Sequence, residues 1–260
     1  MIKIGPAGSS GLGILKGLEH TRQLGLDATE VEFTYGVNMT NELAKQAGEL
    51  AKKLKIDLSV HAPYYINLAS EEKPKIHASI TRILQSCERA NHLGATHVVF
   101  HAAFYGKRTE NEVKEMVKDA IIEISDKIKE KKWDVILAPE TTGKKSQFSG
   151  LDELIDLQKE LKRKNVAFCT DFSHLYAREC GKIDYDEVFS KLKKSGLKHF
   201  HCHFSGIEFT AKGERNHIIT TPAFFKPLAE ALKKYKLDVT IINESPQPFE
   251  DAVMMKNMLK

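Results

Sequence analysis

The sequence is poor in cysteine, and its cysteines form no paired motif. The four of them, Cys87, Cys169, Cys180 and Cys202, lie far apart in a chain of 260 residues. A disulfide framework or a thiolate zinc site needs closely spaced pairs such as Cys-x-x-Cys. The sequence indicates neither, and we expect reduced and largely buried thiols.

Long apolar runs and linker-like stretches are also missing. No run approaches the roughly eighteen apolar residues of a membrane span, and residues 1–5 read as the start of a strand instead of a signal peptide. No segment rich in proline, glycine and serine divides the chain, of which 42% is hydrophobic. We expect one soluble, cytoplasmic and monomeric domain over residues 1–260, with no membrane contact.

A phosphate-binding loop and a strong charge bias are absent as well. The glycines of residues 8–13 match neither GxGxxG nor GxxxxGK[ST], so we interpret this stretch as a turn, or as room for a ligand to approach the backbone. The net charge of +4 and the pI near 8.7 are only mildly basic. This balance permits a polyanionic partner without requiring one.

What the sequence does contain is a regular alternation of short apolar segments and helix-like segments. The expected strands are residues 2–6, 28–33, 57–61, 97–101, 135–140, 166–171, 198–204 and 239–244. The expected helices are residues 13–24, 41–54, 77–93, 111–131, 151–162, 185–194, 222–235 and a last one from residue 249. Eight such units in about 250 residues predict an α/β fold of the (β/α)8 TIM-barrel type. An open, doubly wound sheet is the alternative, but it would not bring all strand ends to one mouth.

Side chains that can bind metal ions end six consecutive strands of this pattern. They are His61, His101, Glu140, Asp171 followed by His174, the pair His201 and His203, and Glu244. A buried carboxylate must be paired, hydrogen-bonded or metal-bound, because an isolated charge is costly to remove from water. Asp171 taken alone could equally be the N-cap of the next helix. The repetition at successive strand ends favours a metal centre at the mouth of the barrel.

The ligand types narrow the chemistry of this centre. Histidine with aspartate or glutamate, and without cysteine, is the ligand set of catalytic zinc or manganese. The number of ligands indicates more than one ion. Ions about 3.5–4 Å apart, joined by a bridging carboxylate, are typical of phosphoester hydrolysis.

The motifs at these strand ends resemble, in order and spacing, those of the endonuclease IV family of apurinic/apyrimidinic (AP) DNA-repair endonucleases. The matching motifs are His61-Ala-Pro-Tyr64-Tyr-Ile-Asn67, Phe100-His101, Pro139-Glu140-Thr, Thr170-Asp171-Phe-Ser-His174, His201-Cys-His-Phe-Ser205 and Asn243-Glu244-Ser-Pro. The resemblance spans nearly the whole chain. It implies a barrel hydrolase with a zinc cluster that cuts double-stranded DNA 5′ to an abasic site and leaves a 3′-hydroxyl.

The resemblance also implies a role for each ligand. The first zinc ion would be held by His61 and His101, and Glu140 would bridge it to the second zinc ion. The ligands of the second ion would be completed by Asp171, His201 and Glu244. The third zinc ion would be held by His174. Glu140 and Glu244 are the expected catalytic carboxylates. Two or three Zn²⁺ ions are expected, with Mn²⁺ as an alternative metal.

Two departures from the family pattern affect this assignment. Where the family has Asp-Arg-His, this chain reads Gly213-Glu-Arg-Asn-His217, so Glu214 and His217 are the expected partners of His174, or the third site is incomplete. Where the family has His-x-Asn-Asp-Ser-Lys, this chain has a second histidine, His203, which points the same way as His201 and is a candidate extra ligand.

Residues around the predicted mouth are candidates for DNA contact. Tyr64 falls on the family's aromatic residue that enters DNA beside the lesion, although it could simply line the mouth. The basic residues available to meet phosphates are Lys107, Arg108, Lys144, Lys212 and Arg215. Each of them could equally be solvated loop charge.

A sugar or sugar-phosphate isomerase or epimerase of the xylose-isomerase-like superfamily is the alternative function. Its single-metal site resembles Glu140, Asp171, one histidine of the seventh strand and Glu244. Such a site has no need for further imidazoles at residues 61, 101 and 217, whereas a metal cluster does. A non-catalytic DNA-binding protein is disfavoured because no helix-turn-helix or zinc-finger pattern occurs.

Overall fold

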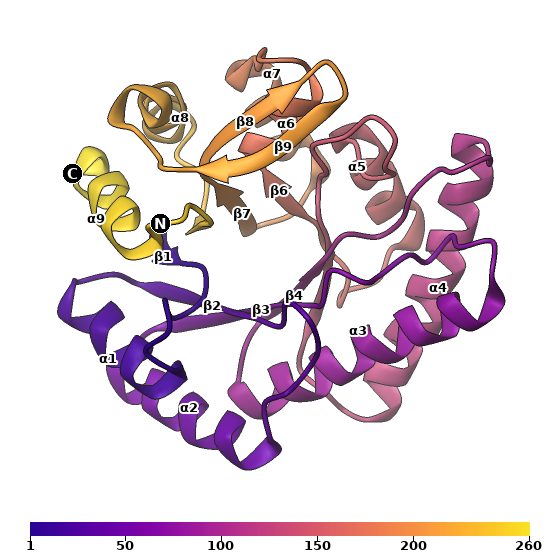
Figure 1. Ribbon diagram of the computed structural model, residues 1–260, viewed down its shortest axis with the longest axis horizontal. Coiled ribbons are helices and arrows are strands. Elements are labelled where there is room, and N and C mark those ends of the chain that lie inside the picture. Colours follow the sequence, from indigo (N-terminus) through magenta and orange to yellow (C-terminus); the bar gives the residue numbers. More distant parts are fainter.

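Eight parallel strands form the inner wall of the molecule in the computed structural model, which describes residues 1–260. They are β1 (Ile2–Pro6), β2 (Ala28–Glu32), β3 (Asp57–His61), β4 (His97–Phe100), β5 (Ile136–Pro139), β6 (Cys169–Asp171), β7 (Phe200–Phe204) and β10 (Val239–Asn243). The strands pair in two groups, β2-β3-β4-β5 and β1-β10-β7-β6. Parallel bridges between Ala7 and Glu30 and between Glu140 and Cys169 join the groups, so the sheet closes into a barrel (Figure 1). The predicted TIM-barrel fold is confirmed.

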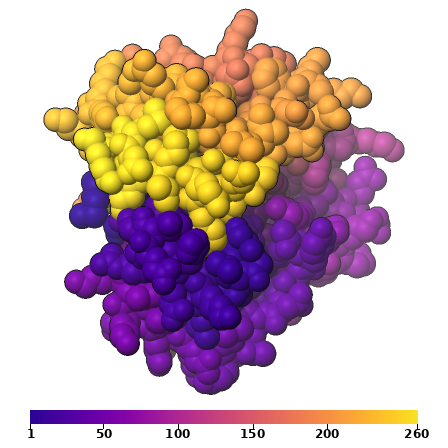
Figure 2. Space-filling view, turned by 60° about the vertical axis from the view of Figure 1, so that its left-hand side comes forward, coloured from indigo at the N-terminus to yellow at the C-terminus, as the bar shows by residue number.

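An outer ring of helices covers this barrel. Its members are α1 (Ile14–Gln23), α2 (Asn41–Leu54), α3 (Lys73–Leu93), α4 (Glu110–Glu130), α5 (Leu151–Leu161), α7 (Tyr185–Ser195), α8 (Pro222–Tyr235) and α9 (Pro248–Leu259). Helix α4 illustrates why these helices could be predicted from the sequence. It begins at a capping box of Thr109 and Glu112 and buries one apolar face. Helix α9 packs against both β1 and α8 and closes the ring beside the first segments of the chain (Figure 2). No helix is long and apolar enough to cross a membrane.

The apolar core lies mainly between strands and helices, whereas the barrel beneath its mouth holds a small apolar group and buried polar side chains such as Glu30 and His201. One apolar cluster of 58 buried residues occupies the space between the two layers. A separate group of Val99, Ala138 and Cys169 lies on the inward faces of β4, β5 and β6. Because side chains alternate along a strand, the residues two positions further on, His101, Glu140 and Asp171, also face inward. This alternation positions polar groups at the mouth.

Two parts of the fold were not predicted from the sequence. A short helix, α6 (Phe172–Arg178), begins directly after β6, and its N-cap is Asp171. A hairpin of β8 (Gly206–Thr210) and β9 (Gly213–Ile218) replaces the expected loop after the seventh barrel strand (Figure 1). Both elements carry residues of the metal centre described below.

Candidate metal centre

Glu140 lies at the centre of the mouth and contacts histidines through both carboxylate oxygens. It follows β5 and is fully buried. Its Oε2 lies 3.2 Å from Nε2 of His61 and 3.0 Å from Nε2 of His101. Its Oε1 lies 3.2 Å from Nδ1 of His203 and 3.3 Å from Nδ1 of His174. The two oxygens thus face different ligand groups, as a bridging carboxylate requires.

The first group consists of His61, His101 and Glu140, whose ligand atoms lie within 4.8 Å of one another. Nδ1 of His61 lies 2.8 Å from the carbonyl oxygen of Ala62. Because a carbonyl can only accept, Nδ1 carries a proton, and Nε2, which faces Glu140, is the nitrogen that the neutral ring can offer to a metal ion. The structure therefore brings together the residues expected at the first zinc.

The second group consists of Glu140, Asp171, His203 and Glu244. Asp171 Oδ1 accepts from the backbone N–H groups of Ser173 at 2.6 Å and His174 at 2.8 Å, which makes it the N-cap of α6. Asp171 Oδ2 is buried and has no hydrogen-bond partner. One oxygen therefore caps the helix while the other remains available to a cation, so the two interpretations of Asp171 are compatible.

The expectation for His201 is corrected by the register of β7. His203 pairs with Asp171 at the level of the mouth, whereas His201 pairs with Cys169 one layer deeper. There the His201 ring stacks on His97, with centroids 5.1 Å apart. The histidine that lies among the carboxylates of the second group is His203 instead of His201.

The third group forms between α6 and the unpredicted hairpin. Nδ1 of His174 lies 2.9 Å from the carbonyl oxygen of Thr141, so this nitrogen donates and Nε2 is free. That Nε2 lies 3.3 Å from Nε2 of His217 and 3.5 Å from Oε2 of Glu214. Two imidazole nitrogens facing each other at this distance need a proton or a cation between them.

A β-bulge places Glu214 and His217 on the same side of β9. Three residues apart on a regular strand, they would point to opposite faces. Glu208 pairs with Asn216 and Phe209 pairs with Glu214, which leaves Arg215 as the extra residue. The bulge shifts the alternation by one residue and directs both side chains toward His174.

The charges of the mouth balance one another only through protons on the histidines. Burial alone would lower the pKa of His61, but its hydrogen bond to Glu140 and the nearby Glu32 raise it to about 10. Burial would raise the pKa of Glu244, but the charge and hydrogen bond of His203 hold it at about 2. Metal ions would supply the same positive charge, and histidine nitrogens with carboxylate oxygens are the donors that zinc takes. The residues present therefore fit a zinc cluster.

Two carboxylates of β2 belong to this mouth and were missed in the sequence. Glu30 is fully buried, and its ligand oxygen lies within 4.8 Å of those of Glu32 and Glu244. Burial raises the pKa of Glu32 to about 8, and its Oε1 has no hydrogen-bond partner. Residues 30 and 32 lie two positions apart near the end of the second strand and therefore share one face. The same alternation of side chains that identified the ligands at the other strand ends could have found them.

Exposed aromatic side chains surround the mouth. They extend from the loops after β2, β3 and β4, and they are Tyr35, Tyr64, Tyr65 and Phe104, of which Tyr64 is 53% exposed. The ring centroid of Tyr64 is 5.9 Å from that of His61, so this side chain leans over the first ligand group. Only Tyr64 was singled out from the sequence.

The five basic residues expected around the mouth differ in availability. Lys107, Lys212 and Arg215 are exposed, the latter two on the hairpin, whereas Lys144 is half-buried. Arg108 donates a hydrogen bond to the carbonyl oxygen of Ala69 at 2.9 Å, so its guanidinium group is partly occupied by a contact within the protein.

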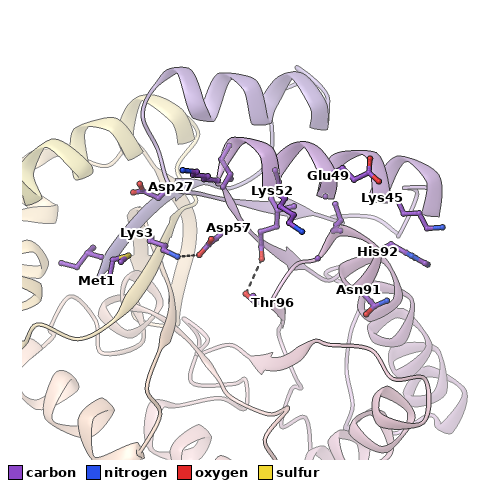
Figure 3. A pocket seen from close by; sticks show the side chains of 18 of the residues that line it. Met1, Lys3, Asp27, Lys45, Glu49, Lys52, Asp57, Asn91, His92 and Thr96 are labelled. Atoms are coloured by element: carbon purple, nitrogen blue, oxygen red, sulfur yellow. Dashed lines mark hydrogen bonds and ion pairs between the residues drawn. The ribbon is translucent and has the colours of Figure 1, made fainter.

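A hollow of about 910 Å³ lies at the other end of the barrel. Figure 3 shows Lys3 paired with Asp57 there, with Lys52 and Thr96 nearby. It shares no residue with the ligand groups.

A second hollow of about 390 Å³ adjoins the mouth and is lined by residues 8–11, Glu30 and Glu32. The glycine stretch therefore borders an open space beside the metal centre.

Comparisons with known proteins identify the family of the chain. The sequence matches the model of the xylose isomerase-like TIM barrel family over residues 18–258. The chain belongs to this family. A relative from Methanocaldococcus jannaschii, an uncharacterised protein, is 38% identical over 92% of this chain and 89% of its own. A probable endonuclease 4 from Metamycoplasma arthritidis is 27% identical over 81% of this chain and 78% of its own.

Solved structures with the same fold carry other names. A D-tagatose 3-epimerase-like protein has a TM-score of 0.75 at 20% identity, covering 99% of this chain and 95% of its own. The IolI protein with a bound zinc atom also has a TM-score of 0.75, at 18% identity, covering 98% of this chain and 96% of its own. At these identities the similarity establishes the fold alone. Relatives by sequence are thus named probable endonuclease 4, whereas a protein that shares the fold is named epimerase-like.

Proposed function

We propose that this member of the family is a metal-dependent endonuclease that hydrolyses the DNA phosphodiester bond 5′ to an abasic site. The observation that carries the proposal is the meeting of three ligand groups around Glu140. A single-metal enzyme needs only the second group. The additional imidazoles of His61, His101, His174 and His217 have a use when two further ions are held.

Each ligand group has a defined part in this proposal. The first ion would be held by His61, His101 and Glu140, the second by Glu140, Asp171, His203 and Glu244, and the third by His174, Glu214 and His217. Bound zinc ions supply charge that lowers the pKa of a water molecule and stabilises the leaving oxygen. Carbonyl oxygens of Ala62 and Thr141 hold two of the imidazoles in fixed tautomers. These orientations exist without any rearrangement of the mouth.

The rim of the mouth suits a large substrate with stacked bases. Tyr64 stands beside the first ligand group and is free to fill the space of a missing base. Lys212 and Arg215 extend from the hairpin toward solvent, where they can meet phosphates. The carboxylates beneath repel phosphate, so DNA binding over the mouth requires the charge of the metal ions.

Sugar epimerisation is the second candidate function. Glu140, Asp171, His203 and Glu244 form by themselves the kind of single-ion site that such an enzyme uses, with two carboxylates to move a proton. In that case the first and third ligand groups would remain without metal. The two candidates therefore differ in substrate and in the number of ions.

The test is an assay of zinc-loaded protein on a duplex with one tetrahydrofuran abasic analogue, with an intact duplex as control. We expect a single cut 5′ to the analogue that leaves a 3′-hydroxyl and is abolished by a chelator. D-Fructose and D-tagatose are incubated in parallel. Epimerised ketose together with an uncut duplex would replace the endonuclease proposal with the second candidate.

A further inference from the structure

Glu30 lies in the barrel interior between the two histidines of β7. Its Oε2 accepts hydrogen bonds from Oγ of Ser59 at 2.6 Å and from Nε2 of His201 at 2.8 Å. Its Oε1 lies 2.8 Å from Nε2 of His203. The carboxylate is fully buried and is held by groups from two other strands, β3 and β7, so its position is fixed.

His203 differs from the other buried ligands in the partner of its distal nitrogen. Nδ1 of His61 and Nδ1 of His174 each donate to a backbone carbonyl, which leaves the opposite nitrogen free. Nε2 of His203 is buried and has no carbonyl partner. It lies 2.8 Å from Oε1 of Glu30, at an angle outside that of a regular hydrogen bond, and neither atom has a hydrogen bond to another group. Glu30 thus occupies the place that a carbonyl oxygen takes beside the other two rings.

The other nitrogen of His203 points into the second ligand group. Its Nδ1 lies 3.2 Å from Oε1 of Glu140 and 3.2 Å from Oε1 of Glu244. A metal ion binds an imidazole nitrogen that carries no proton, so the proton of the neutral ring must reside on Nε2. A carboxylate that accepts this proton's hydrogen bond orients the ring and makes it a stronger ligand.

We propose that Glu30 is a positioning residue that fixes His203 in the tautomer with its proton on Nε2, so that Nδ1 serves the second metal ion. This inference rests on the proposed metal centre. It also gives His201 a role different from the expected one, since His201 and Ser59 hold the carboxylate that orients His203. Partners of this kind typically contribute ten- to a hundredfold to metal affinity.

The test compares Glu30→Gln with Glu32→Gln, a matched variant that removes one carboxylate from the same strand. Zinc affinity is measured by competition with a chelating dye, and unfolding curves verify that each variant folds. ¹H–¹⁵N spectra of zinc-loaded protein with ¹⁵N-labelled histidine report the proton on each ring nitrogen. We expect wild type to show the His203 proton on Nε2 in slow exchange with solvent.

Glu30→Gln should weaken the tightest zinc-binding step about ten- to a hundredfold and shift the His203 Nε2 resonance. Glu32→Gln should leave that resonance in place. If Glu30→Gln does not fold, the wild-type spectrum alone decides, because a His203 proton on Nδ1 contradicts the inference. Zinc binding by wild type with an unchanged spectrum and affinity in Glu30→Gln would overturn the role of Glu30 and leave the metal centre intact. Failure of wild type to bind zinc would overturn both.

Discussion

Glu140 is the residue on which the proposed metal centre depends most, because it is the only side chain shared by the first two ligand groups. Glu140→Gln keeps the volume of the side chain but replaces the carboxylate with a neutral amide. An amide is a poor metal ligand and cannot balance the positive charge of two cations. We expect activity on abasic duplex to fall below detection and metal content to drop by at least one ion. Metal analysis and the incision assay check this together. Full activity with unchanged metal content would contradict the bridging role.

Tyr64 is the residue at which recognition of the lesion can be separated from metal binding. Stacking of an aromatic side chain on a base is worth about 1–3 kcal/mol, so Tyr64→Ala should reduce the preference for abasic over intact duplex roughly ten- to a hundredfold. Zinc content should not change. Tyr65→Ala is the matched control, since Tyr65 is also exposed, at 61%, whereas the ring near His61 is that of Tyr64. An equal loss of preference in both variants would indicate a general aromatic surface.

The ligands at single strand ends could be predicted because period two places alternate residues on one face. The same rule could not separate His201 from His203, since both face inward and only their depth in the barrel differs. Depth depends on how β7 is staggered against β6, which the sequence of β7 alone does not contain. The partners of the carboxylate Glu30 are equally invisible, because Ser59, His201 and His203 come from distant parts of the chain.

At the scale of elements, the hairpin β8–β9 gives the third ligand group its geometry. Inserting one alanine between Glu208 and Phe209 of β8 should give Arg215 a partner and remove the bulge, so that Glu214 and His217, still three residues apart, point to opposite faces. We expect this variant to lose one ion while keeping the others. Arg215→Ala keeps the bulge and should keep all ions. Metal counts on the two variants check this, and equal counts would show that the bulge does not create the third site.

Strongly periodic elements were predictable, and the hairpin was not. Helix α4 has a capping box and a continuous apolar face, which the sequence displays directly. Among the hairpin residues only Gly206, Ile207 and Gly213 are buried, so the sequence of the hairpin shows no hydrophobic period. The short helix α6 was hidden because Asp171 ends β6 and caps α6 at once, without an intervening turn.

At the scale of the whole molecule, the histidines of the mouth should make stability depend on pH when metal is absent. The folded pKa of His61 is raised from 6.5 to about 10, so its contribution is complete below about pH 6.5 and is lost as pH rises toward 10. Glu32 acts in the same direction, because its carboxyl ionises at about pH 8 in the fold and near 4.5 when unfolded. Glu244, at about 2, is fully ionised throughout this range.

We therefore expect the melting temperature of chelator-treated protein to fall by several degrees between about pH 6.5 and pH 10. Zinc-loaded protein should show a smaller change, because metal-bound imidazole nitrogens carry no proton to lose. Differential scanning calorimetry of both forms in the same buffers makes the comparison. A melting temperature that rises with pH in the chelated form, or identical curves for the two forms, would contradict the charge balance described for the mouth.

The fold of the molecule was predictable as a whole because eight strand–helix units have few ways to bury their apolar faces. The choice between nuclease and epimerase is harder, because both proposals would use the second ligand group, with Glu140, Asp171 and Glu244. The difference lies in whether the first and third ligand groups hold ions.

Anomalous scattering at the zinc edge from crystals of zinc-loaded protein is the most direct measurement of this difference. We expect three peaks of anomalous density: one at His61 and His101, one among Glu140, Asp171, His203 and Glu244, and one between His174 and His217. A single peak within the second group, in protein saturated with zinc, would contradict the cluster and favour a single-metal enzyme.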